Sequence, residues 1–330
     1  MAPVNVTGGD YAPWASTVDE CRREFVRVAR TFLIVPELIP LVARNDIALL
    51  YCFCRRLDDA VDEAESPEGA RAALVRWRDE LSGREARRPL ISAFLAGVPR
   101  NGLPLDCVDY LLAGMEMDLG AARFADDDAL LRYAYRVSAS VGLMLAPLFG
   151  IRGVAGEHCV IDLGLALQLS NILFGVADDA HRGRVYLPAT RLAAVGLTAD
   201  DVLRDPSDHR LLPVLEGVAV LADRYYRSGM AGIAVVPLRY RHGALLLGRV
   251  YGALGRRAAR GEGTLTTPAM LPLREKVFYL AGLFVNAWSP RTLGLLPAPP
   301  HDPALHRALA GLRGAHVELE QRGPTPVPAR

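Results

Sequence analysis

An acidic cluster at the end of an apolar segment is the first feature of this sequence that could do chemistry. Residues 49–63 read Leu-Leu-Tyr-Cys-Phe-Cys-Arg-Arg-Leu-Asp-Asp-Ala-Val-Asp-Glu. In a helix that turns about 100° per residue, one face would carry Tyr51, Arg55, Asp58 and Asp62. The segment therefore predicts a polar stripe that ends in carboxylates.

These carboxylates repel one another, so the stripe calls for a compensating cation. Like charges four residues apart cost a helix roughly a few tenths of a kcal/mol, and more among apolar neighbours. Oxygen ligands without a nearby histidine or cysteine suit a hard ion, and Mg²⁺ prefers a couple of carboxylates together with water and phosphate oxygens. A solvated helix end, with Arg55 and Arg56 as salt-bridge partners, is the alternative that this segment alone leaves open.

A second polar stripe follows another apolar segment. By the same angular count, one face of the helix would carry Gln168, Asn171, Gly175, Asp179 and Arg182. Asp178 precedes Asp179, and Arg184 and Tyr186 follow on a tight turn at Gly183. A guanidinium binds phosphate oxygens in pairs and stays charged where water is excluded, so these arginines suit a phosphate-bearing substrate.

Apolar residues recur at helical spacing from Val18 onward, so helices must position both stripes. Helices are predicted at residues 18–33, 37–63, 67–82, 104–121, 126–150, 155–181, 207–231, 236–261 and 272–288. Strand-like alternation is scarce, and the breaks between segments carry Pro, Gly and Asp. We expect an all-α protein with one helical domain at 18–288, a flexible N-terminus at 1–17 and a Pro-rich C-terminal tail at 289–330.

Composition and charge exclude several classes of protein. Apolar residues make up 51% of the chain and charged residues 23%, which is enough apolar material for a large core. The 38 basic and 37 acidic residues nearly cancel, so no net field would attract nucleic acid. We find neither a secretory signal in Met1–Thr17 nor an apolar run near the ~20 residues of a membrane-spanning helix.

Cysteine and histidine offer no metal site in the sequence. The five cysteines lack the spacing of a disulfide scaffold, and no further ligand completes a site with Cys52 and Cys54. We therefore expect core packing for these thiols and a reducing cytoplasm for the protein. The seven histidines are scattered and form no spaced pair on one helix face.

Taken in their order along the chain, the two stripes resemble the motifs of the squalene and phytoene synthase family. The resemblance rests on Tyr-x-x-x-Arg-x-x-Asp-Asp-x-x-Asp at Tyr51 to Asp62, and on Gln-x-x-Asn followed by Arg-Gly-Arg-x-Tyr-Leu-Pro at Arg182 to Pro188. It extends over about Cys21 to Leu295. Further agreement comes from Gly114 to Leu119, Tyr133 to Val137, Val141-Gly142 and Tyr251.

This resemblance implies an isoprenoid-synthase helical bundle around a central cavity, across which the two motifs face each other. It implies Mg²⁺ ligands at Asp58, Asp59, Asp62, Asp178 and Asp179. It implies catalytic roles for Tyr51, Arg55, Tyr133 and Arg184, and substrate contacts for Gln168, Asn171, Arg182, Tyr186 and Tyr251. Asp118 is expected as a polar member of the cavity wall.

The implied reaction is the head-to-head condensation of two prenyl diphosphates. Metal ions stabilise the departing pyrophosphate, and an apolar cavity shelters the allylic carbocation from water. We favour two geranylgeranyl diphosphates, joined to phytoene through a cyclopropyl diphosphate intermediate. Farnesyl diphosphate, giving squalene or dehydrosqualene, is the alternative, and NADPH is needed only for squalene. The insoluble product predicts contact with a membrane surface.

One departure from the family's pattern leaves a further alternative open. The family usually begins its second motif with Arg-Asp, whereas this chain has Phe174-Gly175. The second aspartate site is therefore incomplete, and the chain could be an impaired family member that acts in binding or assembly. The intact first motif favours an enzyme.

Overall fold

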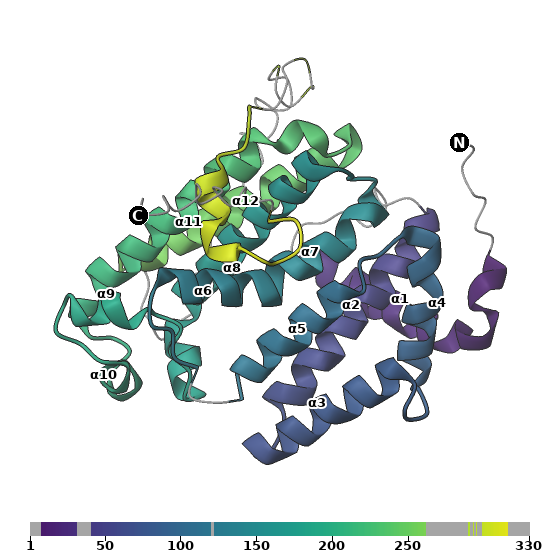
Figure 1. Cartoon of the computed structure of the whole chain (residues 1–330), viewed down its shortest axis with the longest axis horizontal. Coiled ribbons are helices and arrows are strands. Elements are labelled where there is room, and N and C mark those ends of the chain that lie inside the picture. Colours follow the sequence, from purple (N-terminus) through teal and green to yellow (C-terminus); the bar gives the residue numbers. More distant parts are fainter. Residues whose placement is uncertain are drawn as a thin grey trace, which may run out of the picture.

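The fold is a bundle of helices with no strand in the part of the chain that the structure describes (Figure 1). The computed structural model describes residues 8–31, 41–119, 122–261, 290, 293, 295 and 299–315. The predicted all-α class is therefore confirmed. The helix predicted at 272–288 lies outside the described residues.

The N-terminal half packs around one helix, α2. Its helices are α1 (Ala15–Thr31), α2 (Leu41–Asp62), α3 (Pro67–Ser82), α4 (Pro89–Asn101) and α5 (Asp106–Met117). Helices α1, α3 and α4 all contact α2. In the core, the ring of Phe53 stacks on Phe94 with centroids 4.3 Å apart and meets the edge of Trp77 at 5.3 Å. Burial of these rings holds α2 in place.

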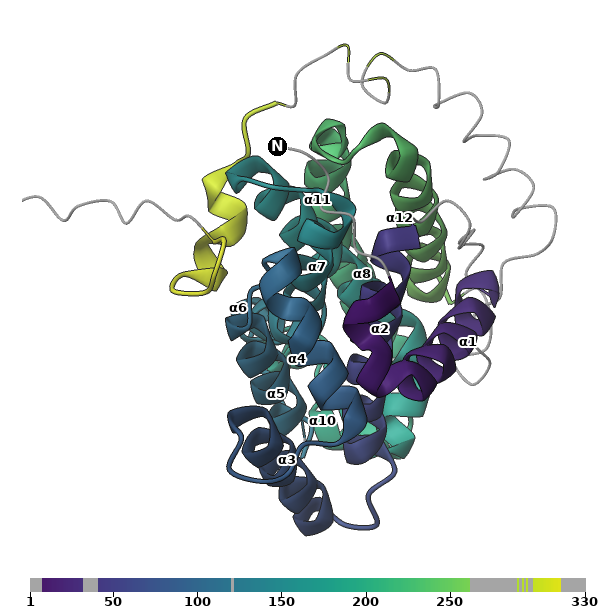
Figure 2. The ribbon, with the colours of Figure 1, turned by 90° about the vertical axis from the view of Figure 1, so that its right-hand side faces the viewer.

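The C-terminal half packs around α8, the longest helix described. Its main helices are α6 (Asp127–Ala134), α7 (Ser140–Leu145), α8 (Val154–His181), α11 (Leu212–Ala231) and α12 (Leu238–Ala259). Figure 2 shows α8 between α7 and α12, both of which it contacts, and α11 packs along it as well. Contrary to the prediction that no apolar run is long enough, α8 could cross a membrane by length and composition, but 67% of its most apolar window is buried inside the bundle. Its apolar character is thus that of a central core helix.

The chain between Asp127 and Phe149 is helical throughout but changes pitch. A π-helical turn, η3 (Tyr135–Ala139), joins α6 to α7, and a 3₁₀ turn follows. A Cβ atom on Gly164 of α8 would lie 2.6 Å from the Cα of Ala139, and the Ser138 hydroxyl donates to the Gly164 carbonyl at 2.8 Å. Glycine is therefore required where α8 and η3 touch.

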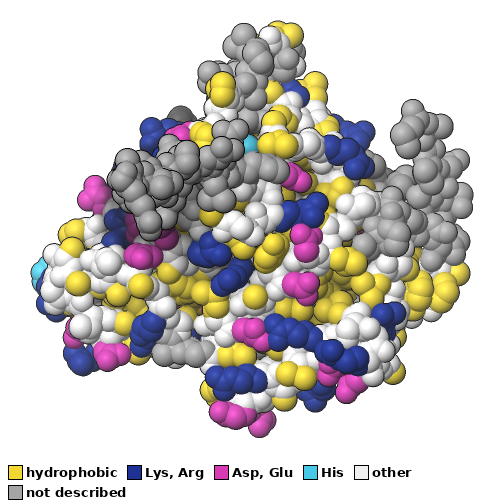
Figure 3. Space-filling model, in the orientation of Figure 1, with side chains coloured by type: hydrophobic (Ala, Val, Ile, Leu, Met, Phe, Trp, Pro, Cys, Tyr) yellow, Lys and Arg dark blue, Asp and Glu magenta, His cyan; other side chains and the backbone are white. Residues whose placement is uncertain are grey.

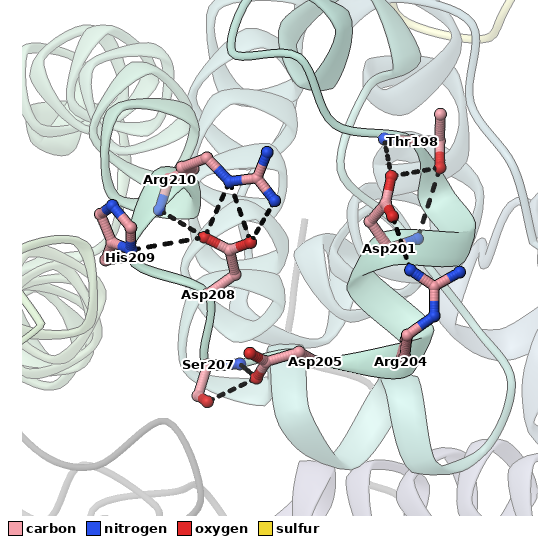
Figure 4. Close-up of polar contacts among 8 residues, drawn as sticks. All are labelled: Thr198, Asp201, Arg204, Asp205, Ser207, Asp208, His209 and Arg210. Atoms are coloured by element: carbon pink, nitrogen blue, oxygen red, sulfur yellow. Dashed lines mark hydrogen bonds and ion pairs between the residues drawn. The ribbon is translucent and has the colours of Figure 1, made fainter.

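Short polar helices link α8 to α11 and were not predicted. They are α9 (Ala189–Ala193) and α10 (Ala199–Arg204). Figure 4 shows that Thr198 and Asp201 cap α10 reciprocally, with the Thr198 N–H 2.9 Å from the Asp201 carboxylate. Charged side chains of both signs are interspersed over the face in Figure 3, as expected for a net charge of +1.

Helix α4 was not predicted either. Gly97 and Pro99 resemble a break in the sequence, but Pro89 begins a helix that ends only at Asn101. Ile91 and Phe94 are buried in the core that surrounds α2. Tertiary packing of these side chains therefore stabilises a helix despite its Gly and Pro.

Parts of both terminal segments pack on the bundle instead of lying free of it. The turn η1 (Gly8–Trp14) places Tyr11 in the core, where its hydroxyl donates to the carboxylate of Asp46. The turn η7 (Pro303–Leu309) lies against α6, and its Leu309 has no exposed surface. The Tyr225 hydroxyl donates to the Leu305 carbonyl at 2.8 Å. The flexible N-terminus at 1–17 and the Pro-rich C-terminal tail at 289–330 stay predictions, because much of both ranges lies outside the described residues.

Candidate active site

Both predicted stripes open onto one cavity of about 680 Å³. Its polar end is lined by Tyr51, Arg55, Asp58, Asp62, Asp118, Tyr133, Gln168, Asn171, Asp179, Arg182, Arg184 and Tyr186. The rest of its wall is apolar and includes Leu111, Met115, Val137, Val141, Leu145, Phe149, Ile151, Val160, Leu163 and Leu247. Val160 and Asp179 both lie on α8, so the cavity follows this helix for roughly 28 Å at about 1.5 Å per residue.

The end of α2 supplies two carboxylates to the cavity. Asp58 and Asp62 line it one helical turn apart. Asp59 does not line it, because the next residue on a helix points about 100° away. The Asp59 carboxylate lies instead 2.8 Å from the Arg55 guanidinium and 3.7 Å from that of Arg56.

Two arginines that follow α8 cross the cavity mouth to Asp62. The Arg184 guanidinium lies 2.8 Å from one Asp62 oxygen and that of Arg182 lies 2.5 Å from the other. Only 13% of the Arg184 side chain is exposed, against 55% of the Arg182 side chain. The tight turn at Gly183, with a positive φ of 76°, aims both arginines at the end of α2.

Asp118, the expected polar wall residue, is held by two tyrosines. Its carboxylate accepts from the Tyr186 hydroxyl at 2.7 Å and from the Tyr133 hydroxyl at 3.1 Å, and the two rings stack with centroids 5.0 Å apart. Burial raises the pKa of Asp118 to about 6, against the lowering effects of Tyr186, Arg184 and Tyr133. Three separate segments form this cluster, so no local sequence pattern could have revealed its contacts.

Asp179 fills the space that the missing side chain of Gly175 leaves. A Cβ atom on Gly175 would lie 3.2 Å from the Asp179 Oδ2. Burial raises the pKa of Asp179 to about 7, although Arg184 lowers it. Burial and the charge of Asp62 also raise the pKa of Asp58. These carboxylates fit a divalent cation, because they offer hard oxygen ligands and a cation would compensate charges that burial disfavours.

Two further predicted residues do not line the cavity. Asp178 is exposed at the surface of α8. The Tyr251 ring lies against Phe174, with centroids 5.9 Å apart, and neither side chain lines the cavity. The structure therefore gathers most of the predicted site residues but not Asp59, Asp178 or Tyr251.

We predict that the metal-free protein loses stability as the pH rises from about 4 to about 7. Asp179 has an ordinary pKa of 3.8 and a raised pKa of about 7 in the fold. Between these values the folded state binds more protons than the unfolded state, so stability is greatest at low pH and falls through this window. Thermal unfolding in EDTA should show a smaller decline for Asp179→Asn than for the wild type. Equal declines would contradict the assignment of the raised pKa to this carboxyl.

The sequence matches the squalene/phytoene synthase family over residues 25–276. It is 33% identical over 309 residues to a phytoene synthase of Cereibacter sphaeroides, covering 89% of this chain and 85% of that protein. It is 29% identical over 287 residues to a 15-cis-phytoene synthase of Pantoea ananas, covering 83% of this chain and 93% of that protein.

Two solved structures of synthases share the fold. A dehydrosqualene synthase superposes with a TM-score of 0.70 at 21% identity, covering 84% of this chain and 98% of its own. A squalene synthase from Alicyclobacillus acidocaldarius superposes with a TM-score of 0.65 at 22% identity, covering 76% and 94%. At these identities the likeness concerns the arrangement of the helices.

Proposed function

Because the chain belongs to the squalene/phytoene synthase family and is therefore a prenyltransferase, we propose that it joins two geranylgeranyl diphosphates head to head. The product would be phytoene, formed through a cyclopropyl diphosphate intermediate with release of pyrophosphate. One observation carries this proposal: the motifs on α2 and after α8 line the polar end of a cavity that is otherwise apolar. Relatives named phytoene synthase favour the C20 substrate.

The polar end of the cavity would bind the diphosphates by an exchange of partners. Arg184 and Arg182 pair with Asp62. Diphosphate oxygens compete for the same guanidinium groups, which frees the Asp62 carboxylate for a cation. Mg²⁺ held by Asp58, Asp62 and Asp179 would neutralise the charge that develops on the departing diphosphate.

The apolar wall would protect the reacting hydrocarbon chains. Leucine and valine side chains of α5, α7 and α8, together with Phe149 in the 3₁₀ turn after α7, would exclude water from an allylic cation. Tyr133 and Tyr186 donate their hydroxyls to Asp118 and stack on each other, so they hold the Asp118 carboxylate in place at the polar end of the cavity. Burial raises the pKa of both hydroxyls, which keeps them neutral.

Incubation with a defined substrate tests this proposal. Purified protein is supplied with geranylgeranyl or farnesyl diphosphate, with and without Mg²⁺ and NADPH, and the hydrocarbon is identified by mass. We expect phytoene from geranylgeranyl diphosphate, dependent on Mg²⁺ and independent of NADPH. A C30 product from farnesyl diphosphate would assign the alternative substrate. Absence of any pyrophosphate release would favour a binding or assembly protein.

We predict that restoring the second motif with Phe174→Arg and Gly175→Asp tightens Mg²⁺ binding and raises turnover by up to roughly tenfold, equivalent to about 1.4 kcal/mol. The added carboxylate would support the departing pyrophosphate. Because a Cβ at position 175 lies against the Asp179 carboxylate, Gly175→Ala is the matched control that displaces Asp179 without adding charge. Turnover at several Mg²⁺ concentrations measures both effects.

A decrease in turnover would identify a different role for the missing side chain at Gly175. Lower turnover or an altered product in the double variant would mean that Gly175 leaves room for the substrate or an intermediate. Unchanged rate, product and Mg²⁺ dependence would mean that this face of α8 does not reach the reacting diphosphate.

We also propose a cytoplasmic protein that contacts a membrane surface to release its product. All five cysteines are free thiols, which fits a reducing compartment. A C40 hydrocarbon is insoluble in water and must pass into lipid. Because the net charge is only +1, we predict that the contact is apolar and insensitive to salt. Flotation with neutral liposomes at low and high salt measures this, and protein that stays at the bottom of both gradients contradicts it.

A further inference from the structure

Three histidines that are far apart in the sequence meet beside α8, outside the active-site cavity. His158 lies in the second turn of α8, and His301 and His306 lie in the segment that contains η7. One ring nitrogen from each lies within 4.8 Å of the other two. No pattern in the sequence predicts this cluster, because only the packing of the C-terminal segment on α8 creates it.

A buried carboxylate orients two of these rings. Asp162, one turn beyond His158 on α8, lies with its Oδ2 3.1 Å from the Nε2 of His301 and its Oδ1 2.9 Å from the Nε2 of His306. An ionised carboxylate only accepts hydrogen bonds, so each Nε2 donates its proton to Asp162, and the Nδ1 of a neutral ring would then offer its lone pair to a metal. This is the arrangement by which a carboxylate orients histidine ligands toward a metal.

The Nδ1 of His306 is the second observation that points to a ligand. The His306 ring is 1% exposed, and its Nδ1 is buried without a hydrogen-bond partner. A buried acceptor without a partner costs about 1–3 kcal/mol, so native proteins seldom leave one unsatisfied. A cation bound to this lone pair would satisfy it. The ring centroids of His301 and His306 lie 4.3 Å apart, close enough for both to reach the same ion.

We propose that His158, His301 and His306 bind a divalent transition metal of the zinc type, which fastens the C-terminal segment to α8. Imidazole nitrogens suit Zn²⁺ and its neighbours, whereas Mg²⁺ prefers oxygen. Three neutral imidazoles would leave the charge of the ion uncompensated. The Asp162 carboxylate, which is hydrogen-bonded to two of these rings, would supply a negative charge next to the ligands. Three protein ligands leave a fourth position for water.

Metal analysis of untagged protein tests this proposal. The protein is incubated with Zn²⁺ and excess Mg²⁺, passed through gel filtration and measured by mass spectrometry of the metals. We expect about one zinc per chain. His158→Gln and His301→Gln change the less buried ligands and should weaken zinc binding by roughly tenfold or more. A loss of this size is typical even when a residue that only hydrogen-bonds to a metal ligand is replaced. His209→Gln, at a histidine that is 90% exposed, is the matched control and should bind as the wild type does.

Two further measurements use the wild-type protein alone and therefore do not depend on whether a variant folds. Zinc should raise the unfolding temperature of the wild type in the presence of Mg²⁺, because it binds only the folded state. Co²⁺ in place of zinc should give the visible absorption of nitrogen-ligated cobalt. A wild-type protein that retains no zinc, shows no shift and gives no such absorption overturns the proposal, as does equal binding by the wild type and His301→Gln. Neither result depends on which prenyl diphosphate the enzyme uses.

Discussion

Asp58→Ala and Asp62→Ala are each expected to reduce product formation by at least about 10³-fold while the helical fold persists. Both carboxylates line the cavity at the end of α2, and neither fills the core. Each would hold the cation that supports the departing diphosphate, a stabilisation of several kcal/mol in comparable enzymes. Product is measured by mass spectrometry, and the fold by circular dichroism.

The two variants should differ in stability when no metal is present. The charge of Asp62 raises the pKa of Asp58, so Asp58→Ala relieves repulsion and should leave the unfolding temperature unchanged or slightly higher in EDTA. Asp62→Ala removes the ion-pair partner of the largely buried Arg184 and should lower the unfolding temperature in EDTA. Asp128→Ala, at an exposed carboxylate in the first turn of α6, is the control and should retain activity. Turnover retained by Asp58→Ala would refute the first metal site.

Arg184→Lys is expected to lower kcat/KM by roughly 10²-fold, the equivalent of about 2.7 kcal/mol. The Arg184 side chain is 13% exposed and points across the cavity mouth to Asp62. A lysine keeps the positive charge, but as a single point it cannot offer the planar pair of donors that binds two phosphate oxygens at once. Because lysine keeps the charge, the charge alone would predict little change in kcat/KM, and the expected loss comes from the missing second donor. Steady-state kinetics with the prenyl diphosphate measures kcat/KM.

The matched control for this change is Arg210→Lys. Arg210 also pairs through its fork, with nitrogens 3.0 and 2.6 Å from the Asp208 Oδ2, but it lies in the surface link between α10 and α11 (Figure 4). Its replacement should alter kcat/KM by less than about twofold, because surface ion pairs contribute little. Similar losses in both variants would mean that Arg184 acts through general stability and not through the substrate.

Local signals made most of the fold predictable. The predicted helix 67–82 coincides with α3, because Ser66 caps it, Pro67 starts it and Gly83 ends it with a φ of 78°. The helix predicted at 155–181 differs from α8 by one residue, because a long apolar segment without Pro is most readily buried as a helix. Helix α4 escaped prediction because its stability depends on contacts with α2, which no window of sequence contains.

Angular counting predicted which site residues share a helix face but not which neighbouring side chains they meet. Asp58 and Asp62 reach the cavity, whereas Asp59 and Asp178, one position from their neighbours in the motifs, turn away from it. The pairing of Asp62 with Arg184 joins two segments that only the tertiary fold brings together. The histidine cluster was missed for the same reason.

The packing of η7 on α8 also bears on how the cell makes this protein. Leu309 and His306 are buried against helices synthesised much earlier, and Asp162 depends on His301 and His306 for two of its hydrogen-bond donors. A nascent chain that ends before His301 therefore exposes an apolar surface and holds a buried carboxylate with fewer donors, which costs stability. Truncated products of interrupted translation should thus be recognised by chaperones and proteases, while completed chains escape them.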